Sequence, residues 1–187
     1  CGTVEIGSFF GFPTGFVNPG PPVNNAPAVA LPSFDTNFFN YYSSNATTKY
    51  ATSKTFTNTT VGASLNDITY VAGNVTFTGN CTVNGCVVAT GDINFQISSL
   101  TQNQAGNLPA FMSINGSINF AAASTTINGL VYAGNNINGI WINAFTPIHI
   151  NGCLYATGQI ANIYGTTVNY VQPNPPGLSG QNMRIVS

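Results

Sequence analysis

The second half of the chain repeats one short pattern of apolar and polar positions. Three segments align around an Asn-Gly pair that is followed by three mostly apolar residues and an alanine: Val83–Ile93, Ile127–Ile137 and Ile150–Ile160. Tyr70–Val75 and Phe111–Ile118 are weaker copies of the same unit. Self-similarity of this kind predicts one structural unit that is built several times and stacked.

A glycine near the end of each unit anchors the alignment, and the anchors are spaced 18, 25, 18 and 24 residues apart. The anchors are Gly73, Gly91, Gly116, Gly134 and Gly158. A period of this length with two apolar strands per repeat is typical of a β-solenoid. Asn-Gly and Thr-Gly pairs suit its corners, because asparagine and glycine tolerate positive φ.

The residues after each anchor alternate between apolar and polar. An aliphatic residue comes first, a polar residue follows, and in three copies a phenylalanine comes third. The members are Val75, Ile93, Ile118, Ile137 and Ile160, then Thr76, Asn94 and Asn119, then Phe77, Phe95 and Phe120. Because period-2 alternation places apolar side chains on one face of a strand, we expect an aliphatic ladder and a Phe ladder inside the solenoid. Outside it, asparagine and threonine side chains should line up and exchange hydrogen bonds.

These patterns predict an all-β protein built on a single-stranded β-helix, of the common right-handed form, over residues 63–172. A β-sandwich whose Asn-Gly pairs close hairpins is the alternative, although a sandwich does not require equivalent residues at a fixed period. Residues 34–62 should supply a short helix, within Leu31–Tyr42 and capped by Asp35 or Ser33, and then an extended lead-in. Residues 1–33 read as an extended arm rich in Gly, Pro and Phe, and 173–187 as a Pro-rich tail.

Charged residues make up only 4% of the 187 residues, against about 25% in ordinary domains. They are Glu5, Asp35, Asp67 and Asp92, and Lys49, Lys54 and Arg184. Three scattered cations cannot form the basic patch that nucleic-acid binding requires. No apolar run approaches the ~20 residues of a membrane-spanning helix. With a net charge of −1, copies repel one another weakly, so we expect self-association.

Four cysteines, Cys1, Cys81, Cys86 and Cys153, are candidates for disulfides, and an even number suits an oxidising compartment. Cys81 and Cys86 flank one corner and could bond, and Cys1 could reach Cys153 of its own chain or of another. Cys86 and Cys153 should not bond to each other, because the alignment puts them three coils apart, ~14 Å, and a disulfide needs Cα atoms within ~7 Å. Equally, both fit as small core residues at the position of Leu130.

Asn-x-Ser/Thr triplets agree with an extracellular or cell-surface location. Five of them are candidate glycosylation sites: Asn45, Asn58, Asn74, Asn80 and Asn115. One interpretation of the opening Cys1-Gly2 is a mature lipoprotein, in which cleavage leaves an N-terminal cysteine, but we favour a proteolytic or cloning boundary. Any export signal is expected to have been removed or to lie outside this sequence.

No group of residues indicates an active site, a cofactor or a metal. Asp92 shares its repeat position with Asn135 and Gln159, which favours a corner-capping role, and Asp67 lies about one coil earlier without a cation beside it. His149, the only histidine, alternates with apolar residues and should point outward from a strand. Most hydrolytic and phosphoryl-transfer chemistry needs clustered ionisable groups. We therefore expect a protein that is not an enzyme and holds no cofactor.

Aromatic residues indicate two kinds of contact. Tyr132 and Tyr155 occupy equivalent repeat positions and, with Trp141 in an insertion, could stack on sugar rings; we favour the interpretation that these rings are core or subunit contacts. Apolar residues near the two ends of the chain are candidates for contacts between copies. These are Phe9, Phe10, Phe12, Phe16, Tyr170 and Val171.

Two features of the sequence together resemble the C-terminal β-helix domains of exported, pilin-like bacterial surface proteins found beside type IV pilus components. One is Leu31-Pro-Ser-Phe-Asp35 with Tyr41-Tyr42 just ahead of the repeats, and the other is the recurring Asn-Gly unit with Gly-Asp-Ile or Gly-Gln-Ile. The resemblance covers roughly residues 26–172. It implies a surface location and association with an appendage, and it supplies no active site. Pilins begin with a hydrophobic assembly helix that this sequence lacks, so the chain is either an exterior domain or a relative that assembles by another route.

Both ends of a solenoid expose unpaired strand edges, and a head-to-tail contact between copies does not close, so it propagates as a fibre. We therefore expect a structural subunit of an extracellular filament or pilus-like appendage. It would self-assemble head to tail through solenoid ends and terminal arms, with a cystine between copies as a staple. The alternative is a monomeric surface adhesin that binds carbohydrate through exposed aromatics. The expected partners are further copies of the chain and other pilus or cell-surface components.

Overall fold

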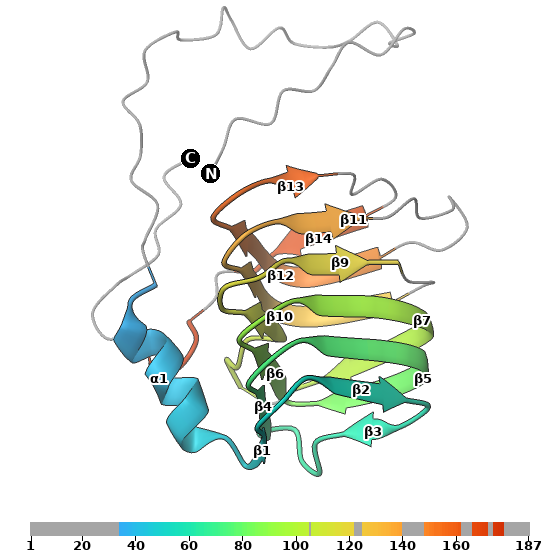
Figure 1. Cartoon of the computed structure of the whole chain (residues 1–187). Helices are drawn as coiled ribbons and strands as arrows, with labels where there is room; N and C mark the ends of the chain where they lie inside the picture. The colour runs from blue at the N-terminus through green and yellow to red at the C-terminus, as the bar shows by residue number, and fades with distance from the viewer. Residues whose placement is uncertain are drawn as a thin grey trace, which may run out of the picture. The chain divides into compact units, whose positions relative to one another are not determined.

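The computed structural model describes residues 34–104, 106–121, 125–139, 148–161, 166–171 and 174–177. The predicted N-terminal arm and most of the predicted C-terminal tail lie outside the described residues. The described residues are mostly β with one short helix, and every strand pair among them is parallel (Figure 1). They form a β-solenoid of about five turns over residues 48–170. The predicted solenoid is confirmed, and the sandwich is excluded because its hairpins would be antiparallel.

The helix is α1 (Thr36–Asn45). The strands are β1 (Thr48–Tyr50), β2 (Lys54–Thr57), β3 (Thr60–Val61), β4 (Ile68–Val71), β5 (Val75–Asn84), β6 (Cys86–Ala89), β7 (Ile93–Asn103), β8 (Phe111–Ser113), β9 (Ile118–Phe120), β10 (Thr125–Ala133), β11 (Ile137–Gly139), β12 (Ile148–Ala156), β13 (Ile160–Ala161) and β14 (Thr166–Tyr170).

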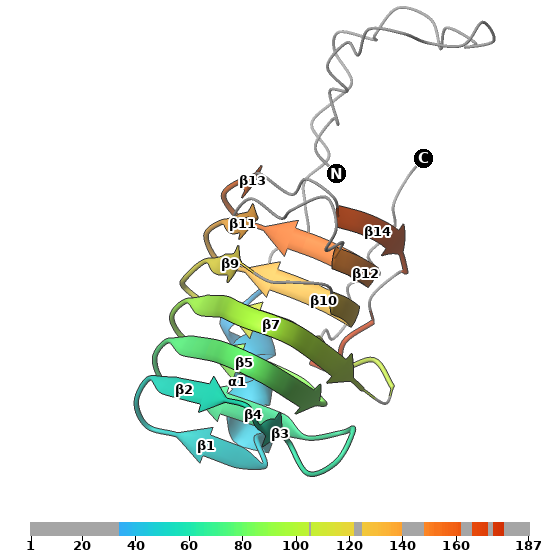
Figure 2. The ribbon, with the colours of Figure 1, turned by 90° about the vertical axis from the view of Figure 1, so that its right-hand side faces the viewer.

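The strands stack into three faces (Figure 2). One face holds β1, β4, β6, β8 and the second halves of β10 and β12. The next holds β2, the first halves of β5 and β7, and then β9, β11 and β13. The third holds β3, the second halves of β5 and β7, the first halves of β10 and β12, and β14. We call β1, β2 and β3 the first coil, and Cys153–Ala156 of β12 with β13 and β14 the last coil.

The solenoid begins at Thr48, earlier than the predicted residue 63. Residues 48–61 already form the first coil, in which Lys54 pairs with Val75 and Phe56 with Phe77. The anchor glycine is missing from this coil, and a lysine occupies the aliphatic position. For these reasons the repeat alignment did not extend to it.

The predicted ladders fill the interior. Val75, Ile93, Ile118, Ile137 and Ile160 stand in register. The phenylalanine rings are stacked, with centroids 5.3 Å apart for Phe77 and Phe95 and 4.9 Å apart for Phe95 and Phe120. Phe56 extends the stack into the first coil at 5.5 Å from Phe77. Apart from Ile160, which is exposed in the last coil, these side chains belong to one buried cluster, so the Phe stack runs through the core.

At one corner of the solenoid, side-chain oxygens of one coil accept hydrogen bonds from backbone amides of the next coil. The Asp92 amide donates to Asn74 Oδ1 at 2.9 Å, and the Ser117 amide donates to Asp92 Oδ1 at 2.7 Å. The Gln159 amide donates to Asn136 Oδ1 at 2.8 Å. The predicted corner-capping role of Asp92 therefore agrees with the bonds. Its equivalent is Asn136 and not Asn135, because Ile93 and Ile137 are in register and fix the residues that precede them.

Asparagine columns run along the outside, as the alternation predicts. On one face Asn119 Nδ2 donates to Asn94 Oδ1 and Asn138 Nδ2 to Asn119 Oδ1, each at 2.8 Å. On another, Asn151 donates to Asn128 and Asn169 to Asn151, each at 3.0 Å. In these columns each donating amide bonds to an asparagine oxygen of the preceding coil. Hydrogen bonds between uncharged side chains therefore order this part of the outer surface.

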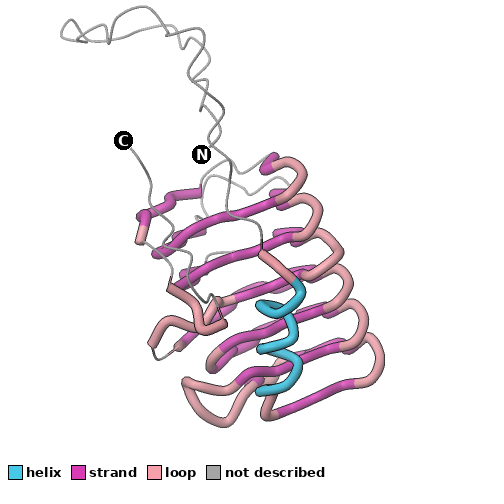
Figure 3. Tube along the Cα trace, turned by 90° about the vertical axis from the view of Figure 1, so that its left-hand side faces the viewer, coloured by secondary structure: helices cyan, strands magenta, loops and turns pink. Residues whose placement is uncertain are grey.

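Helix α1 lies along the stack and across the strands of the first face (Figure 3). Asp35 caps it, accepting a hydrogen bond from the Phe38 amide at 2.9 Å, as one of the two predicted caps. Phe38 and Tyr42 are buried against a second apolar cluster on the outside of that face. Tyr42 Oη also donates to the Pro176 carbonyl at 2.8 Å, which holds residues 174–177 against the helix.

Candidate functional site

Among the described residues, the two ends of the solenoid are the surfaces where strand edges lack a partner strand. Strands β1, β2 and β3 each pair with one neighbour only, and so do β13 and β14. Unpaired edges offer N–H and C=O groups to another chain, which makes them the natural contact surfaces of a solenoid. Their side chains differ sharply between the two ends.

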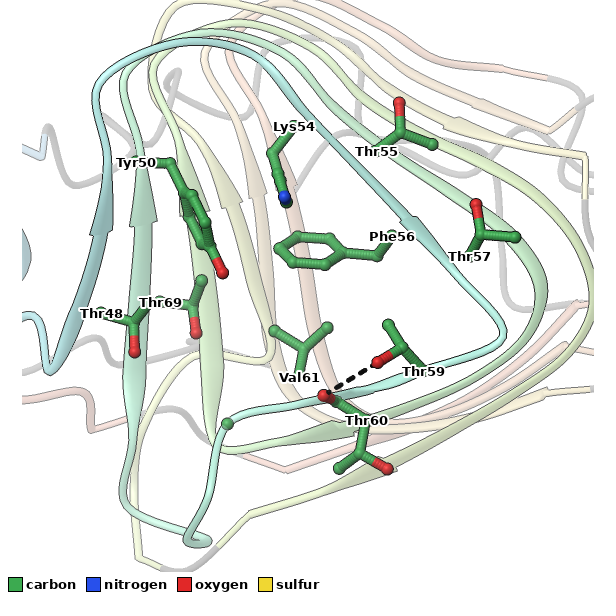
Figure 4. A pocket seen from close by; sticks show the side chains of 11 residues that line it. Thr48, Tyr50, Lys54, Thr55, Phe56, Thr57, Thr59, Thr60, Val61 and Thr69 are labelled. Atoms are coloured by element: carbon green, nitrogen blue, oxygen red, sulfur yellow. Dashed lines mark hydrogen bonds between the residues drawn. The ribbon is translucent and has the colours of Figure 1, made fainter.

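A hollow of about 360 Å³ opens across the first coil (Figure 4). Phe56 and Val61 lie at its base and are nearly buried, with 6% and 4% of their surface exposed. Hydroxyl and backbone groups make up most of the remaining wall. The full lining is Thr48, Tyr50, Lys54, Thr55, Phe56, Thr57, Thr59, Thr60, Val61, Gly62 and Thr69.

Lys54 occupies an inward position in this hollow. Its register places it in the column of Val75 and Ile93, where every later coil has an aliphatic side chain. The ammonium lies 5.0 Å from the centre of the Tyr50 ring, within the range of a cation–π contact. It forms no ion pair with any residue that the structure describes. Covering it with another protein would desolvate an uncompensated charge, at a cost of several kcal/mol.

Both lysines of the chain lie on edge strands of the first coil, Lys49 on β1 and Lys54 on β2. Lysine on an edge strand, and an inward-pointing charge above all, is a device by which β-proteins prevent edge-to-edge association. Stacking of another strand on the first coil would therefore have to bring a second chain against these charges.

The last coil has the opposite character. Ile160, Val168, Tyr170 and Val171 are exposed to 43%, 40%, 47% and 56%. Leu65, on the loop between β3 and β4, is the other large apolar residue of the described surface that is exposed to this degree. Between Asp92 and Arg184 the sequence has no charged residue at all. The last coil thus combines open strand edges with apolar side chains and no charge to keep another chain away.

The predicted tyrosine pair is brought together, with Tyr132 buried and Tyr155 half-buried. Tyr132 and Tyr155 are in register and stacked at 5.5 Å. Phe34 packs edge-on against both rings at 4.9 and 5.0 Å, and Phe39 lies 5.4 Å from Tyr132. Tyr132 is only 4% exposed, so its ring is a contact for α1 and has no free face for a sugar. Trp141, the third residue of the predicted glycan strip, lies outside the described residues.

The described cysteines are free thiols. Cys81 belongs to the interior cluster, whereas Cys86 belongs to the cluster beneath α1, so the side chains of the predicted corner pair point to opposite sides of the wall. No disulfide joins them. Cys86 and Cys153 stand three coils apart, as predicted, with Leu130 between them. Cys153 is the half-buried one of the three, and Cys1 lies outside the described residues.

The remaining predicted residues lie on the surface. The five glycosylation candidates, Asn45, Asn58, Asn74, Asn80 and Asn115, are all exposed, and His149 is half-buried on β12. Asp67 accepts hydrogen bonds from the amides of Ala63 and Ser64 and from the Ser64 hydroxyl, which hold the pKa of its carboxyl below the usual 3.8. In the described residues no three His, Cys, Asp or Glu side chains gather, and no helix there has the length and apolarity to cross a membrane.

Comparison of the chain with protein-family models, with curated proteins and with solved structures returns no match. The β-solenoid implied by the pilin-like resemblance is shown by the structure, and the family itself is not. The predicted Phe9, Phe10, Phe12 and Phe16 contacts lie outside the described residues, whereas Tyr170 and Val171 lie on the exposed last coil.

Sequence reasoning missed the first coil and with it Lys54, the residue that distinguishes the two ends. A signal was present: Lys54-Thr55-Phe56 has the same polar residue and phenylalanine as Val75-Thr76-Phe77. An alignment that had allowed lysine at the aliphatic position would have found both Phe56 and the inward charge.

Proposed function

We propose that the protein is a structural subunit of an extracellular filament or pilus-like surface appendage, whose copies join head to tail. The observation that carries the proposal is the last coil, where exposed apolar side chains and open strand edges coincide. An open edge of this kind is a template for another chain. A contact between two different surfaces of one chain does not close on itself, so it continues as a fibre.

The body of the molecule supports a mechanical role. Stacked rings, aliphatic columns and hydrogen-bonded asparagines tie each coil to the next. The near absence of charge removes the repulsion that keeps copies apart in solution. Five exposed glycosylation candidates agree with a location outside the cell, and the pilin-like resemblance suggests other pilus or cell-surface components as further partners. A disulfide between Cys1 of one copy and Cys153 of another would reinforce the contact covalently. Cys153 is the candidate for this bond because it is the least buried of the described thiols.

The test is negative-stain electron microscopy and sedimentation of the native, unreduced protein. We expect uniform fibres with an axial repeat. Val168→Lys should abolish them, because it places an uncompensated charge on the last coil. Leu65→Lys is the matched control, since Leu65 is exposed to 44% against 40% for Val168 and lies on the loop after the first coil. Isolated particles of single-chain mass in the wild type would contradict the proposal.

A second candidate is a monomeric adhesin that binds carbohydrate. The hollow of the first coil favours it, because the half-buried Tyr50 supplies ring surface beside threonine hydroxyls, and protein–sugar contacts combine these groups. This site replaces the predicted strip of Tyr132 and Tyr155, because Tyr132 is buried beneath Phe34 and Phe39. Screening the protein against immobilised glycans tests it, with Tyr50→Ala as the variant that should lose binding. An unaltered glycan profile in that variant would rule the hollow out.

A further inference from the structure

We propose that the last coil of one copy is covered by the N-terminal segment Phe9–Phe16 of a second copy, and not by that copy's first coil. The inference rests on the proposed filament and names the partner of its contact surface. In this contact the segment pairs with the open strand edge of the last coil as an additional strand. Main-chain hydrogen bonds supply the affinity, and the phenylalanine side chains supply the specificity.

The first coil is a poor partner for the last coil. If two solenoids stacked in register, Lys54 of one copy would continue the column of Ile137 and Ile160 of the other. Its ammonium would then be enclosed by aliphatic side chains. No carboxylate is at hand, because the sequence has no charged residue between Asp92 and Arg184. Lys49, exposed on the neighbouring edge strand β1, adds a second cation.

The last coil needs a partner that is apolar, uncharged and able to extend. The edge of β14 is open on one side, and Val168, Tyr170 and Val171 line it with exposed apolar surface. Phe9–Phe16 supplies four phenylalanines, and the sequence carries no charge between Glu5 and Asp35. Pro13 lacks a backbone N–H, so it suits an outermost strand that accepts no further neighbour.

The reach of the segment fits a neighbouring copy. The described chain begins at Phe34, whose ring lies 5.0 Å from Tyr155 at the last coil. Residues 17–33 connect it to Phe16 and can extend to about 55–60 Å, at about 3.3–3.6 Å per residue. Coils are spaced ~4.8 Å apart, so the connection exceeds the height of the stack and can carry the segment beyond its own body. The contact joins two different surfaces and therefore propagates.

A complementation experiment with the full chain tests this. The donor-defective variant carries Phe9→Ser, Phe10→Ser and Phe12→Ser and keeps an intact last coil. The acceptor-defective variant carries Val168→Lys and Tyr170→Lys and keeps an intact segment. Neither should form fibres alone. Mixed in equal amounts, they should give a single species of twice the monomer mass by sedimentation, because only one junction can form and neither free end can extend it.

The outcomes separate the inference from the proposed function. Fibres formed by the donor-defective variant would overturn the inference and leave the filament standing. A wild type that stays monomeric would overturn the filament and, with it, this contact. Monomers in the mixture, when the wild type forms fibres, would show that the segment covers its own coil and would overturn the inference. Circular dichroism of both variants, and dimer formation itself, show that each keeps its fold.

Discussion

Single side chains of the solenoid make their main contacts with the equivalent residues of the two adjacent coils. Phe95 is fully buried between two parallel rings, tilted by 7° from Phe77 and by 2° from Phe120. Its ring fills space that only the adjacent coils border, so the structure can collapse little around a cavity there. Phe95→Ala should lower the free energy of unfolding by about 3–5 kcal/mol. Denaturant unfolding measures this, and a loss below that of Phe56→Ala, at the open end of the stack, would contradict the stacking argument.

The hydrogen bonds at the corner make a prediction about Asp92. Its carboxylate receives the Ser117 amide at 2.7 Å, and removing it leaves that amide without a partner. Asp92→Ala should destabilise the protein by about 1–3 kcal/mol, whereas Asp92→Asn keeps the acceptor oxygen that Asn74 and Asn136 supply in other coils. Denaturant midpoints of the two variants give the comparison. Equal losses in both would mean that the charge, and not the acceptor, matters at this corner.

Asp67 should make the loop between β3 and β4 sensitive to acid. Hydrogen bonds from Ser64 and Ala63 lower the pKa of its carboxyl below 3.8, so the charged form is favoured in the folded state. Its stabilising contribution is complete above 3.8 and is lost as the pH falls through the lowered pKa. The difference in unfolding free energy between the wild type and Asp67→Asn should therefore shrink as the pH falls from 6 toward 2 (about the range in which carboxyls titrate). A constant difference would contradict this.

At the scale of elements, α1 acts as a cover for the first face. It buries Phe38 and Tyr42 against Cys86, Val88 and their neighbours, which would otherwise form an apolar strip on the outside of the solenoid. Burial also raises the pKa of the Cys86 thiol far above its usual value. The helix therefore decides whether this thiol can react.

Thiol labelling tests the cover. In a Cys1→Ser background at pH 8, we expect Cys153 to react in the native protein and Cys81 and Cys86 to be protected, because both are nearly fully buried. Phe38→Ala should release Cys86 to the reagent while Cys81, inside the solenoid, stays protected. Peptide mapping of the labelled sites gives the readout. Simultaneous labelling of Cys81 and Cys86 would show that helix and solenoid open as one unit.

At the scale of the whole molecule, the distribution of seven charges matters more than their sum. Both lysines are on the first coil, and the last coil has none. The two ends of the described solenoid therefore differ in charge, and the filament that we propose uses this difference to join copies in one direction. A uniform coat of charge would keep copies apart, and in our proposal a chain without Lys49 and Lys54 would be able to associate through both ends.

Removing the two lysines should create a new contact. Lys54→Ile restores the aliphatic column, and with Lys49→Thr it should allow the first coil to stack on the last coil of another copy. We expect this double variant to associate even when Phe9, Phe10 and Phe12 are replaced by serine. Sedimentation compares it with the donor-defective variant that keeps both lysines. If the two sediment alike, the lysines do not bar stacking.

The sequence by itself determined the repeat, the interior ladders, the capped helix and the corner role of Asp92. These features are local, because strand alternation and turn residues are set by neighbours along the chain. The separation of Cys86 from Cys153 also followed, since coil count fixes distance along a solenoid.

Only the tertiary structure decided which surfaces are open. The sequence leaves open whether Tyr132 is exposed, and the α1 residue Phe39, 93 positions earlier in the chain, packs on its ring in the folded protein. Lys54 is unremarkable in sequence and becomes the inward charge of the first coil only when its strand pairs with β5. Exposure depends on contacts between distant segments, which the period of a sequence does not encode, and so the polarity of the molecule became visible only in the folded chain.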